Sequence, residues 1–299
     1  MSHTRSRRDH TVALWTAFAV TVLWSSSWVL IRFVLDDEDL EPLTFAGLRY
    51  GLAAAVVAGA VAVRSDRRAE VSSLGRRSIG RLAILGVVFY AVTQGAQFVA
   101  IDSQPAATTS FVLSLTPLVV ALASARSLGE TPGPSQIVGG VLVVAGALLF
   151  FAGDLGATTV GMIAALVGLA ANVTGGLLGR QVNRRHTTSP LVVTAVSMSI
   201  GAGLLLATGL LIEGVPDLTA RTVVIIAWLA VVNTALAFTM WNAALRHLSA
   251  VESAGINNTM LIQIAVLAWV FLGEFPGPVG LVGIVVVSAG VFLTQAQRS

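Results

Sequence analysis

One group of side chains that could bind a solute lies in an apolar stretch around residue 90. Tyr90, Gln94 and Gln97 recur at i, i+4 and i+7, a spacing that places all three on one stripe of a helix. Amide and hydroxyl groups can hydrogen-bond a polar solute, and an aromatic ring can stack on a flat one. This stripe therefore predicts one wall of a binding cavity.

A second group of the same character lies in the other half of the chain. Asn233 and Trp241 are eight residues apart and share a helical face, and Asn242 follows directly. The set of candidate substrate-binding residues is completed by Trp24, Trp28, Asn172 and Asn258. The alternative for each residue is an ordinary contact between helices, in which a hydrogen bond is worth about 0.6 kcal/mol.

Residues for covalent, acid–base or metal chemistry are missing from these stretches. The sequence has no cysteine, its four histidines lie in tails or loops, and no H-E-x-x-H spacing occurs. No Asp or Glu falls in the middle of an apolar run, which argues against a buried carboxylate that switches protons. We predict no catalytic residue, no metal site and no cofactor, so a membrane-embedded protease or acyltransferase is disfavoured.

The composition indicates which elements must carry the candidate residues. Of the 299 residues, 55% are apolar and only 11% are charged, and the mean hydropathy is +0.84. A soluble protein is about one-quarter charged. Apolar runs recur along the whole chain, and each is long enough to cross a hydrocarbon core of about 30 Å as a helix. The lipid bilayer is therefore the solvent for most of this protein.

The apolar runs predict an all-α membrane protein with ten transmembrane helices. A sheet is excluded because an open strand edge cannot be satisfied in lipid. The approximate limits of the ten spans are 12–34, 43–63, 82–101, 105–125, 135–152, 158–179, 190–212, 222–245, 249–272 and 277–296.

The distribution of arginine predicts the direction of the chain. Fifteen of the 18 arginines fall in the tails and the even-numbered loops, and only Arg221 falls in an odd-numbered loop. Arginines in short loops stay on the cytoplasmic side, so both termini are predicted to be cytoplasmic, in the inner membrane. The same scatter over short loops means that the pI of 10.5 does not indicate a nucleic-acid partner.

The chain repeats itself at an offset of 144 residues. The 21 residues from Gly129 overlay those from Gly273 without a gap, and 12 positions are identical, including G-E-x-P-G-P. Five spans per half make the two halves opposite in orientation, so we predict domains 1–152 and 153–299 as two inverted five-helix repeats. Inverted repeats are typical of secondary transporters that work by alternating access. A duplication that only enlarges a membrane scaffold is the alternative.

Several of these motifs resemble the EamA family of the drug/metabolite transporter superfamily. They are the Gly-Glu turns at 129–130 and 273–274, W-S-S-S-W at 24–28, F-A-G-L-R at 45–49 and S-L-T-P-L at 114–118. The resemblance covers nearly the whole chain. It implies ten helices around a central cavity and export or exchange of small metabolites such as amino acids or drug-like compounds. Leu261 stands at the position equivalent to Pro117, which argues against a helix kink in both halves.

Two arginines fall inside predicted spans. Arg32 lies near the end of the first span and is expected to reach toward the acidic 36–41 stretch. Arg49 lies about two turns into the second span and could bind a substrate carboxylate. A structural role is favoured for Arg49, pairing with backbone carbonyls or with the 36–41 stretch, because the resemblance includes this arginine whatever the substrate.

These observations predict a secondary transporter that exports or exchanges small metabolites, with a small-molecule solute and the bilayer as its partners. A lipid-linked sugar flippase, which the same superfamily includes, stays open as an alternative. A membrane-embedded enzyme is the weaker alternative.

Overall fold

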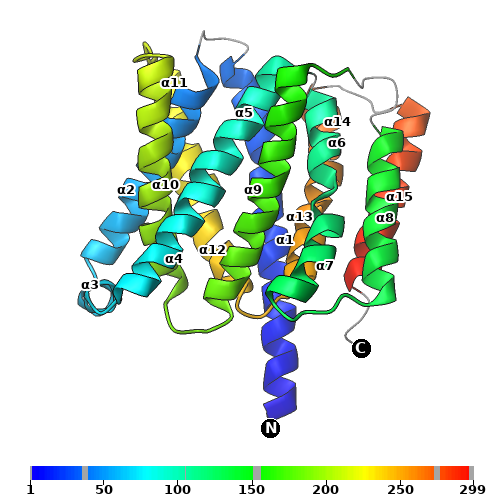
Figure 1. The fold of residues 1–299 in the computed structure, drawn as a ribbon. Coiled ribbons are helices and arrows are strands. Elements are labelled where there is room, and N and C mark those ends of the chain that lie inside the picture. Colours follow the sequence, from blue (N-terminus) through cyan, green and yellow to red (C-terminus); the bar gives the residue numbers. More distant parts are fainter. Residues whose placement is uncertain (1, 36–39, 105, 151–155, 273–276, 296–299) are drawn as a thin grey trace.

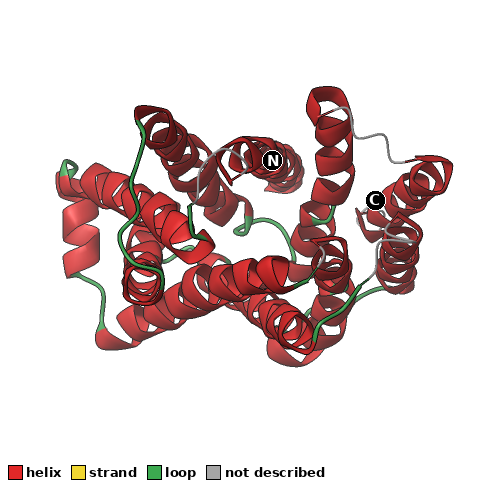
Figure 2. Cartoon of the chain, turned by 90° about the horizontal axis from the view of Figure 1, so that it is seen from above, coloured by secondary structure: helices red, strands yellow, loops and turns green. Residues whose placement is uncertain are grey.

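The computed structural model describes residues 2–35, 40–104, 106–150, 156–272 and 277–295, and every regular element in these ranges is a helix (Figures 1 and 2). The first half contains α1 (Ser2–Leu35), α2 (Pro42–Ala62), α3 (Ser65–Ser72), α4 (Arg76–Gly86), η1 (Val87–Val92), α5 (Thr93–Ser103), α6 (Ala106–Ser114), α7 (Thr116–Ser127) and α8 (Pro134–Phe150). The second half contains α9 (Thr159–Asn183), α10 (Pro190–Ile212), α11 (Ala220–Ala230), η2 (Val231–Leu236), α12 (Ala237–Ala244), α13 (Ala250–Asn257), α14 (Thr259–Leu272) and α15 (Gly277–Gln295). The all-α prediction is confirmed for these residues.

Eight helical stretches within the described ranges are long and apolar enough to cross a membrane, which makes the chain a multi-pass membrane protein. They are Pro42–Ala62, Arg76–Ala100, Thr108–Ser127, Thr159–Asn183, Pro190–Ile212, Ala220–Ala244, Ala250–Phe271 and Gly277–Thr294. The two further predicted spans, 12–34 and 135–152, fall in α1 and in the 17-residue α8. The count of ten spans therefore stays a prediction.

Local sequence sets the ends of many helices. Pro42 and Pro190 open α2 and α10, where the missing backbone N–H costs no hydrogen bond within the helix. Ser249 and Glu252 form a capping box at the start of α13. Gly129 follows α7 with a φ of 67°, a left-handed conformation that glycine adopts without strain.

The helices lie side by side, and the beginning of α1 and the end of α15 reach the same, lower end of the bundle in Figure 1. α2 packs along α10, and α5 packs along α9. The contact of α5 with α9 has a counterpart in the contact of α12 with α1. In the 144-residue offset, α12 corresponds to α5 and α9 to the apolar part of α1, so the two contacts are equivalent.

The closest helix pair is α8 with α15, at one edge of the bundle (Figure 1). Gly139 faces Gly290, and Gly146 faces Gly283. A Cβ atom at any of the four would lie 2.6 Å from a backbone atom of the opposite helix. The offset of 144 relates Gly139 to Gly283 and Gly146 to Gly290, so the glycines that let the backbones touch are the same in both copies.

Two π-helical turns, η1 and η2, interrupt the third and eighth predicted spans, and they also lie 144 residues apart. In each region a threonine hydroxyl donates to the carbonyl five residues earlier. These bonds run from Thr93 to Val88 at 2.8 Å and from Thr234 to Leu229 at 2.9 Å. Single π turns inside α-helices often occur at functional sites. The apolar periodicity of the sequence did not predict them.

The fourth and ninth predicted spans are both broken near their middle. Leu115 separates α6 from α7, and Asn258 separates α13 from α14. Pro117 lacks an N–H, and the Thr116 hydroxyl donates to the Leu113 carbonyl at 2.6 Å instead. The expectation against a kink in both halves is therefore wrong, because the ninth span breaks at Asn258 without a proline.

Candidate functional site

The aromatic part of the candidate site joins α1 to α12. The Trp24 ring lies 4.8 Å from the Phe238 ring and 5.2 Å from the Trp241 ring, centroid to centroid. The Trp24 indole N–H is buried and has no hydrogen-bond partner among the described residues. Because a buried indole N–H is normally bonded, this donor is available to a bound molecule.

Tyr90 extends the same aromatic cluster from η1. Its ring lies 4.9 Å from Phe238 and 6.2 Å from Tyr50. Tyr90 is almost completely buried, so it contributes to the wall behind Phe238. The sequence grouped Tyr90 with Gln94 and Gln97, whereas the structure places Tyr90 against Tyr50 of the first half and Phe238 of the second.

Asn233 lies in η2 and is completely buried. Its amide N–H groups donate to the Leu23 carbonyl and to the hydroxyls of Ser26 and Ser27, both at 3.0 Å. Its amide oxygen has no partner in the described part of the chain. Asn233 therefore holds α1 with its donors and leaves one acceptor unused.

Arg49 projects from α2 into the same region and is only 6% exposed. Its Nε–H donates to the Thr234 hydroxyl at 2.9 Å and its Nη2 group to the Ser27 hydroxyl at 3.3 Å. No carboxylate among the described residues forms an ion pair with it. The partners are hydroxyls and not the expected carbonyls. Residues 36–39 of the acidic stretch lie outside the described ranges.

Gln94 and Gln97 lie on α5, and both are partly exposed. Neither side chain makes a hydrogen bond to a described residue. A Cβ atom at Gly168 would come within 3.9 Å of the Gln97 backbone nitrogen, so α9 passes close to Gln97. Two partly exposed amides without protein partners are suited to contact a solute.

Asn172 and Asn258 tie broken helices together. The Asn172 amide donates to the Thr116 hydroxyl at 3.3 Å, beside the break between α6 and α7. The Asn258 amide donates to the Ser114 carbonyl at 3.0 Å, so the break in one half is bonded to the break in the other. Both residues therefore bond beside the break in the fourth span, Asn172 from the sixth span and Asn258 from the ninth.

Asn242 differs from Asn233 because protein groups use both its amide nitrogen and its amide oxygen. It donates to the Thr194 hydroxyl and the Phe238 carbonyl, both at 3.0 Å, and it accepts from the Asn183 amide at 2.7 Å. This environment fits a packing role. The side chain of Trp28 lies outside the part of the structure that is described.

Sequence reasoning missed Thr234 and Phe238 as parts of this site, whereas the serines of the first span were weaker candidates for it. Phe238 touches Trp24, Tyr50 and Tyr90, but one phenylalanine in an apolar run carries no signal of its own. Thr234 follows Asn233 directly, and that adjacency was the available clue.

A polar network at the lower end of Figure 1 involves the first Gly-Glu turn. The Glu130 carboxylate accepts from the Arg180 Nε–H at 2.9 Å and from the Ala250 N–H at 3.0 Å. Arg180 also donates to the Leu245 carbonyl at 2.8 Å. Glu130 thus caps the start of α13, a helix far away in the sequence, although α8 is the helix that follows Glu130 directly.

Two more glutamates cap helices at opposite ends of the bundle. Glu213 accepts from the Leu43 N–H at 3.1 Å and the Thr44 N–H at 2.6 Å, at the start of α2. Glu70 accepts from the Ser189 N–H and hydroxyl, at the start of α10. Partial burial acts to raise the pKa of Glu70, but hydrogen bonds from Ser189 and Arg67 outweigh it and hold the pKa below its usual value.

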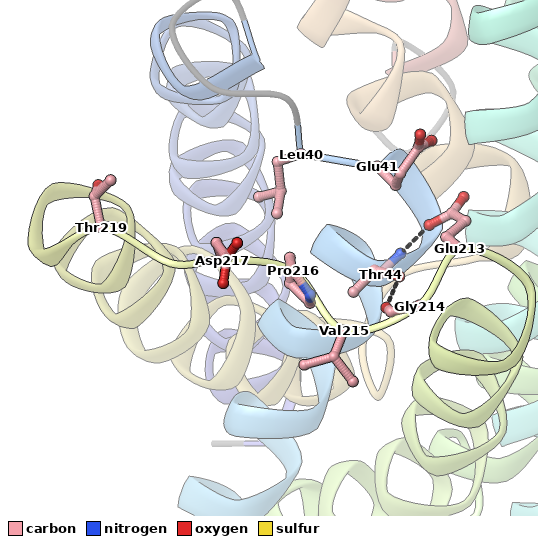
Figure 3. Close-up of a pocket in the computed structure, with 9 residues that line it drawn as sticks. All are labelled: Leu40, Glu41, Thr44, Glu213, Gly214, Val215, Pro216, Asp217 and Thr219. Carbon is pink, nitrogen blue, oxygen red and sulfur yellow. Dashed lines mark hydrogen bonds between the residues drawn. The ribbon is translucent and has the colours of Figure 1, made fainter.

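One cavity of about 410 Å³ opens between α2 and the segment that connects α10 to α11 (Figure 3). Glu41, Glu213 and Asp217 give it an acidic lining, and the Glu213 carboxylate is occupied by the backbone of α2, as Figure 3 shows for Thr44. The cavity contains none of the predicted site residues. Within the described ranges, no cluster of three or more His, Asp or Glu side chains could hold a metal ion.

A bundle of apolar helices with aromatic and amide side chains gathered between them is typical of a membrane transporter. The family model of the EamA-like transporter family matches the chain twice, over residues 11–152 and 159–295, so the chain belongs to that family. The protein is therefore a transporter and not an enzyme.

Two curated relatives align over almost the full length. A protein of Streptantibioticus cattleyicolor, described as a probable terminal-alkyne amino-acid exporter, is 27% identical and covers 95% of this chain and 94% of its own. A protein of Salmonella typhimurium, described as a probable amino-acid metabolite efflux pump, is 26% identical and covers 96% of this chain and 95% of its own. One crystal structure matches with a TM-score of 0.77 at 19% identity, over 95% of this chain and 96% of that chain, and so shares the fold.

Proposed function

We propose that this protein exports small amino-acid-like metabolites by alternating access, around a site between its two halves. One observation carries the proposal: most candidate residues with described contacts, Asn242 apart, contact the opposite half. The Trp24 ring contacts the Trp241 ring, and Asn258 bonds to the Ser114 carbonyl. A movement of one half against the other has to remake these contacts, and a solute bound there couples to that movement.

The reciprocal packing of the halves supports an inverted repeat. Each of the two α8 glycines meets the repeat equivalent of the other on α15, and η1 and η2 stand at the same repeat position. On this proposal, residues 1–152 and 153–299 are five-span units of opposite orientation, and ten helices cross the membrane.

The class of substrate follows from the side chains and from the relatives. Amides, hydroxyls and indole rings suit a small polar solute with an apolar or aromatic part. Both curated relatives carry names that refer to amino acids or their metabolites. Amino acids and their derivatives are therefore the first compounds to test. If none of them is transported, a lipid-linked sugar is the alternative substrate.

Counterflow in liposomes tests this function directly. Liposomes that contain the purified protein are loaded with unlabelled L-phenylalanine, and entry of the labelled compound is followed. We expect transient accumulation that requires the protein and that unlabelled amino acids inhibit. Absence of counterflow for a panel of amino acids, together with movement of a fluorescent lipid-linked sugar, would replace the proposal with a flippase.

The orientation has its own test, since we place both termini in the cytoplasm of a cell with an inner membrane. Ser72, in α3, and Val215, between α10 and α11, are exposed, and these two segments lie at opposite ends of the bundle (Figure 1). In this cysteine-free chain, Val215→Cys should react with an impermeant thiol reagent in intact cells, and Ser72→Cys should react only after lysis. Reaction of both in intact cells would contradict the orientation.

A further inference from the structure

The charge of Arg49 has no counter-ion among the described residues, although its side chain is only 6% exposed. A guanidinium stays charged at any physiological pH, and burial of an unpaired charge is costly. Hydroxyl groups satisfy hydrogen bonds but do not neutralise a charge. We propose that Arg49 binds the carboxylate of the transported solute, an inference that rests on the proposed function and names its substrate class.

The hydrogen bonds of Arg49 leave most of its donors free for this role. A guanidinium has five N–H groups. The Nε–H goes to Thr234 and one Nη2–H to Ser27, and the remaining N–H groups have no partner among the described residues. Paired N–H groups of a guanidinium match the two oxygens of a carboxylate.

The two hydroxyls fix the guanidinium without competing for its charge. Thr234 donates its own hydroxyl proton to the Leu229 carbonyl at 2.9 Å, so its oxygen accepts from Arg49. Ser27 donates to the Leu23 carbonyl at 3.3 Å and accepts from Arg49 in the same way. Because Thr234 lies in η2 and Ser27 in α1, these bonds position Arg49 at the junction of the halves.

A second orphan group lies next to this position. Ser27 accepts from both Arg49 and Asn233, so the two side chains share one partner. The Asn233 oxygen is buried and unpaired among the described residues, and it can accept from a solute ammonium. A cation for the carboxylate and an acceptor for the ammonium together fit an α-amino acid.

The aromatic cluster supplies the third element of recognition. Arg49 lies 5.5 Å from the centre of the Tyr50 ring, and Tyr50 lies 6.0 Å from Phe238. Phe238 in turn contacts Trp24, whose indole N–H is unpaired within the described structure. An apolar or aromatic side chain of the solute can pack on these rings while its charged end is held by Arg49 and Asn233.

A structural role for Arg49 makes different predictions. If the guanidinium only links α1, α2 and η2, its removal weakens the fold and affects all solutes alike. If it binds a carboxylate, its removal affects only solutes that carry one.

The test measures binding and transport separately for two matched solutes, L-phenylalanine and its methyl ester, which lacks the carboxylate. Binding is measured as thermal stabilisation of the purified protein. Transport is measured as inhibition of the counterflow of labelled L-phenylalanine. In the wild type we expect L-phenylalanine to bind roughly ten- to a hundredfold more tightly than the ester. Arg49→Gln should remove this preference by weakening the amino acid and not the ester. Arg126→Gln, at an exposed position, should keep it.

Arg49→Lys covers the case in which the glutamine variant does not fold. Lysine keeps the charge but not the paired geometry, so we expect it to retain part of the preference. Equal binding of the two solutes by the wild type, no binding of either, or an unchanged preference in a folded Arg49→Gln or Arg49→Lys variant would overturn the inference. A preference in binding without any counterflow would support the Arg49 site and contradict the proposed export.

Discussion

The contact between α8 and α15 and the polar region around η1 and η2 are both built from repeated segments, yet they have diverged to different degrees. In the 21 residues that begin at Gly129 and at Gly273 and include most of α8 and α15, 12 positions are identical. From Val87 to Ala100 and its copy, Val231 to Ala244, only four of 14 positions are identical. Although the side chains of these two segments differ, both segments contain a π turn.

This difference separates packing from recognition. The α8–α15 contact needs glycine in both copies, because each glycine meets the backbone of the opposite helix. The third and eighth spans carry different side chains. The third presents partly exposed amides, whereas the eighth contains a buried asparagine and a buried tryptophan. A symmetric contact constrains both copies equally, whereas an asymmetric solute can be bound by unlike walls.

The largest effect is expected from a methyl group placed in the symmetric contact. A Cβ atom at Gly146 would lie 2.6 Å from the Val287 nitrogen and 2.7 Å from the Gly283 oxygen. We expect Gly146→Ala to destabilise the protein by about 1–3 kcal/mol, measured by thermal unfolding in detergent. Gly176→Ala is the control, because no atom lies within 4 Å of its added Cβ. Equal stability of the two variants would contradict the claim that the α8–α15 contact requires glycine.

The Glu130 network should behave as a packing element, like the glycine contact. Glu130→Ala removes the ion pair with Arg180 and the cap of α13, and we expect a loss of about 2 kcal/mol in the free energy of unfolding. Solute affinity of the folded protein should not change. Asp66→Asn is the control, since its carboxylate is 66% exposed. Normal stability with abolished transport would move Glu130 into the binding site.

A tryptophan of the candidate site should affect binding more than a tryptophan on the outside. Trp24 lies against Phe238 and Trp241, whereas Trp228 is 56% exposed. We expect Trp24→Ala to weaken the stabilisation by L-phenylalanine about tenfold, through the lost stacking and the lost N–H donor. Trp228→Ala should leave it unchanged. Similar affinities of the two variants would assign Trp24 to packing.

The smallest effect concerns a capping glutamate. The pKa of Glu70 is below its usual value in the folded protein, so its contribution to stability is complete above a pH of about 4.5 and is lost as the pH falls through the folded pKa. The wild type should therefore lose more thermal stability on acidification than Glu70→Gln. Parallel curves for the two proteins would show that this cap contributes nothing to the pH dependence.

The sequence predicted the fold well where apolar runs are long. The span expected at 190–212 coincides with α10, and the others match within a few residues, except that α1 and α4 begin well before the expected starts at 12 and 82. The π turns and the break at Asn258 were not predicted, because neither a threonine hydroxyl that bonds a carbonyl five residues earlier nor an asparagine amide that bonds another helix alters the apolar periodicity.

Prediction of the site was less complete. Trp24, Trp241 and Asn233 come together as candidates on one junction, but Asn242 bonds to Asn183 and Thr194. A polar residue in an apolar run is visible in the sequence, whereas the partner that uses its hydrogen bonds belongs to another helix. For the same reason, the hydroxyl partners of Arg49 could not be foreseen.

Protection of a single cysteine by the solute tests most directly whether the solute occupies the junction between the halves. Gln97 is partly exposed and its side chain has no partner in the described structure, so Gln97→Cys in the otherwise cysteine-free chain should react with a hydrophilic thiol reagent. Saturating L-phenylalanine should slow this reaction, while reaction of Ser72→Cys stays constant. An unchanged rate at Gln97→Cys, in protein that still performs counterflow, would contradict a site at the junction.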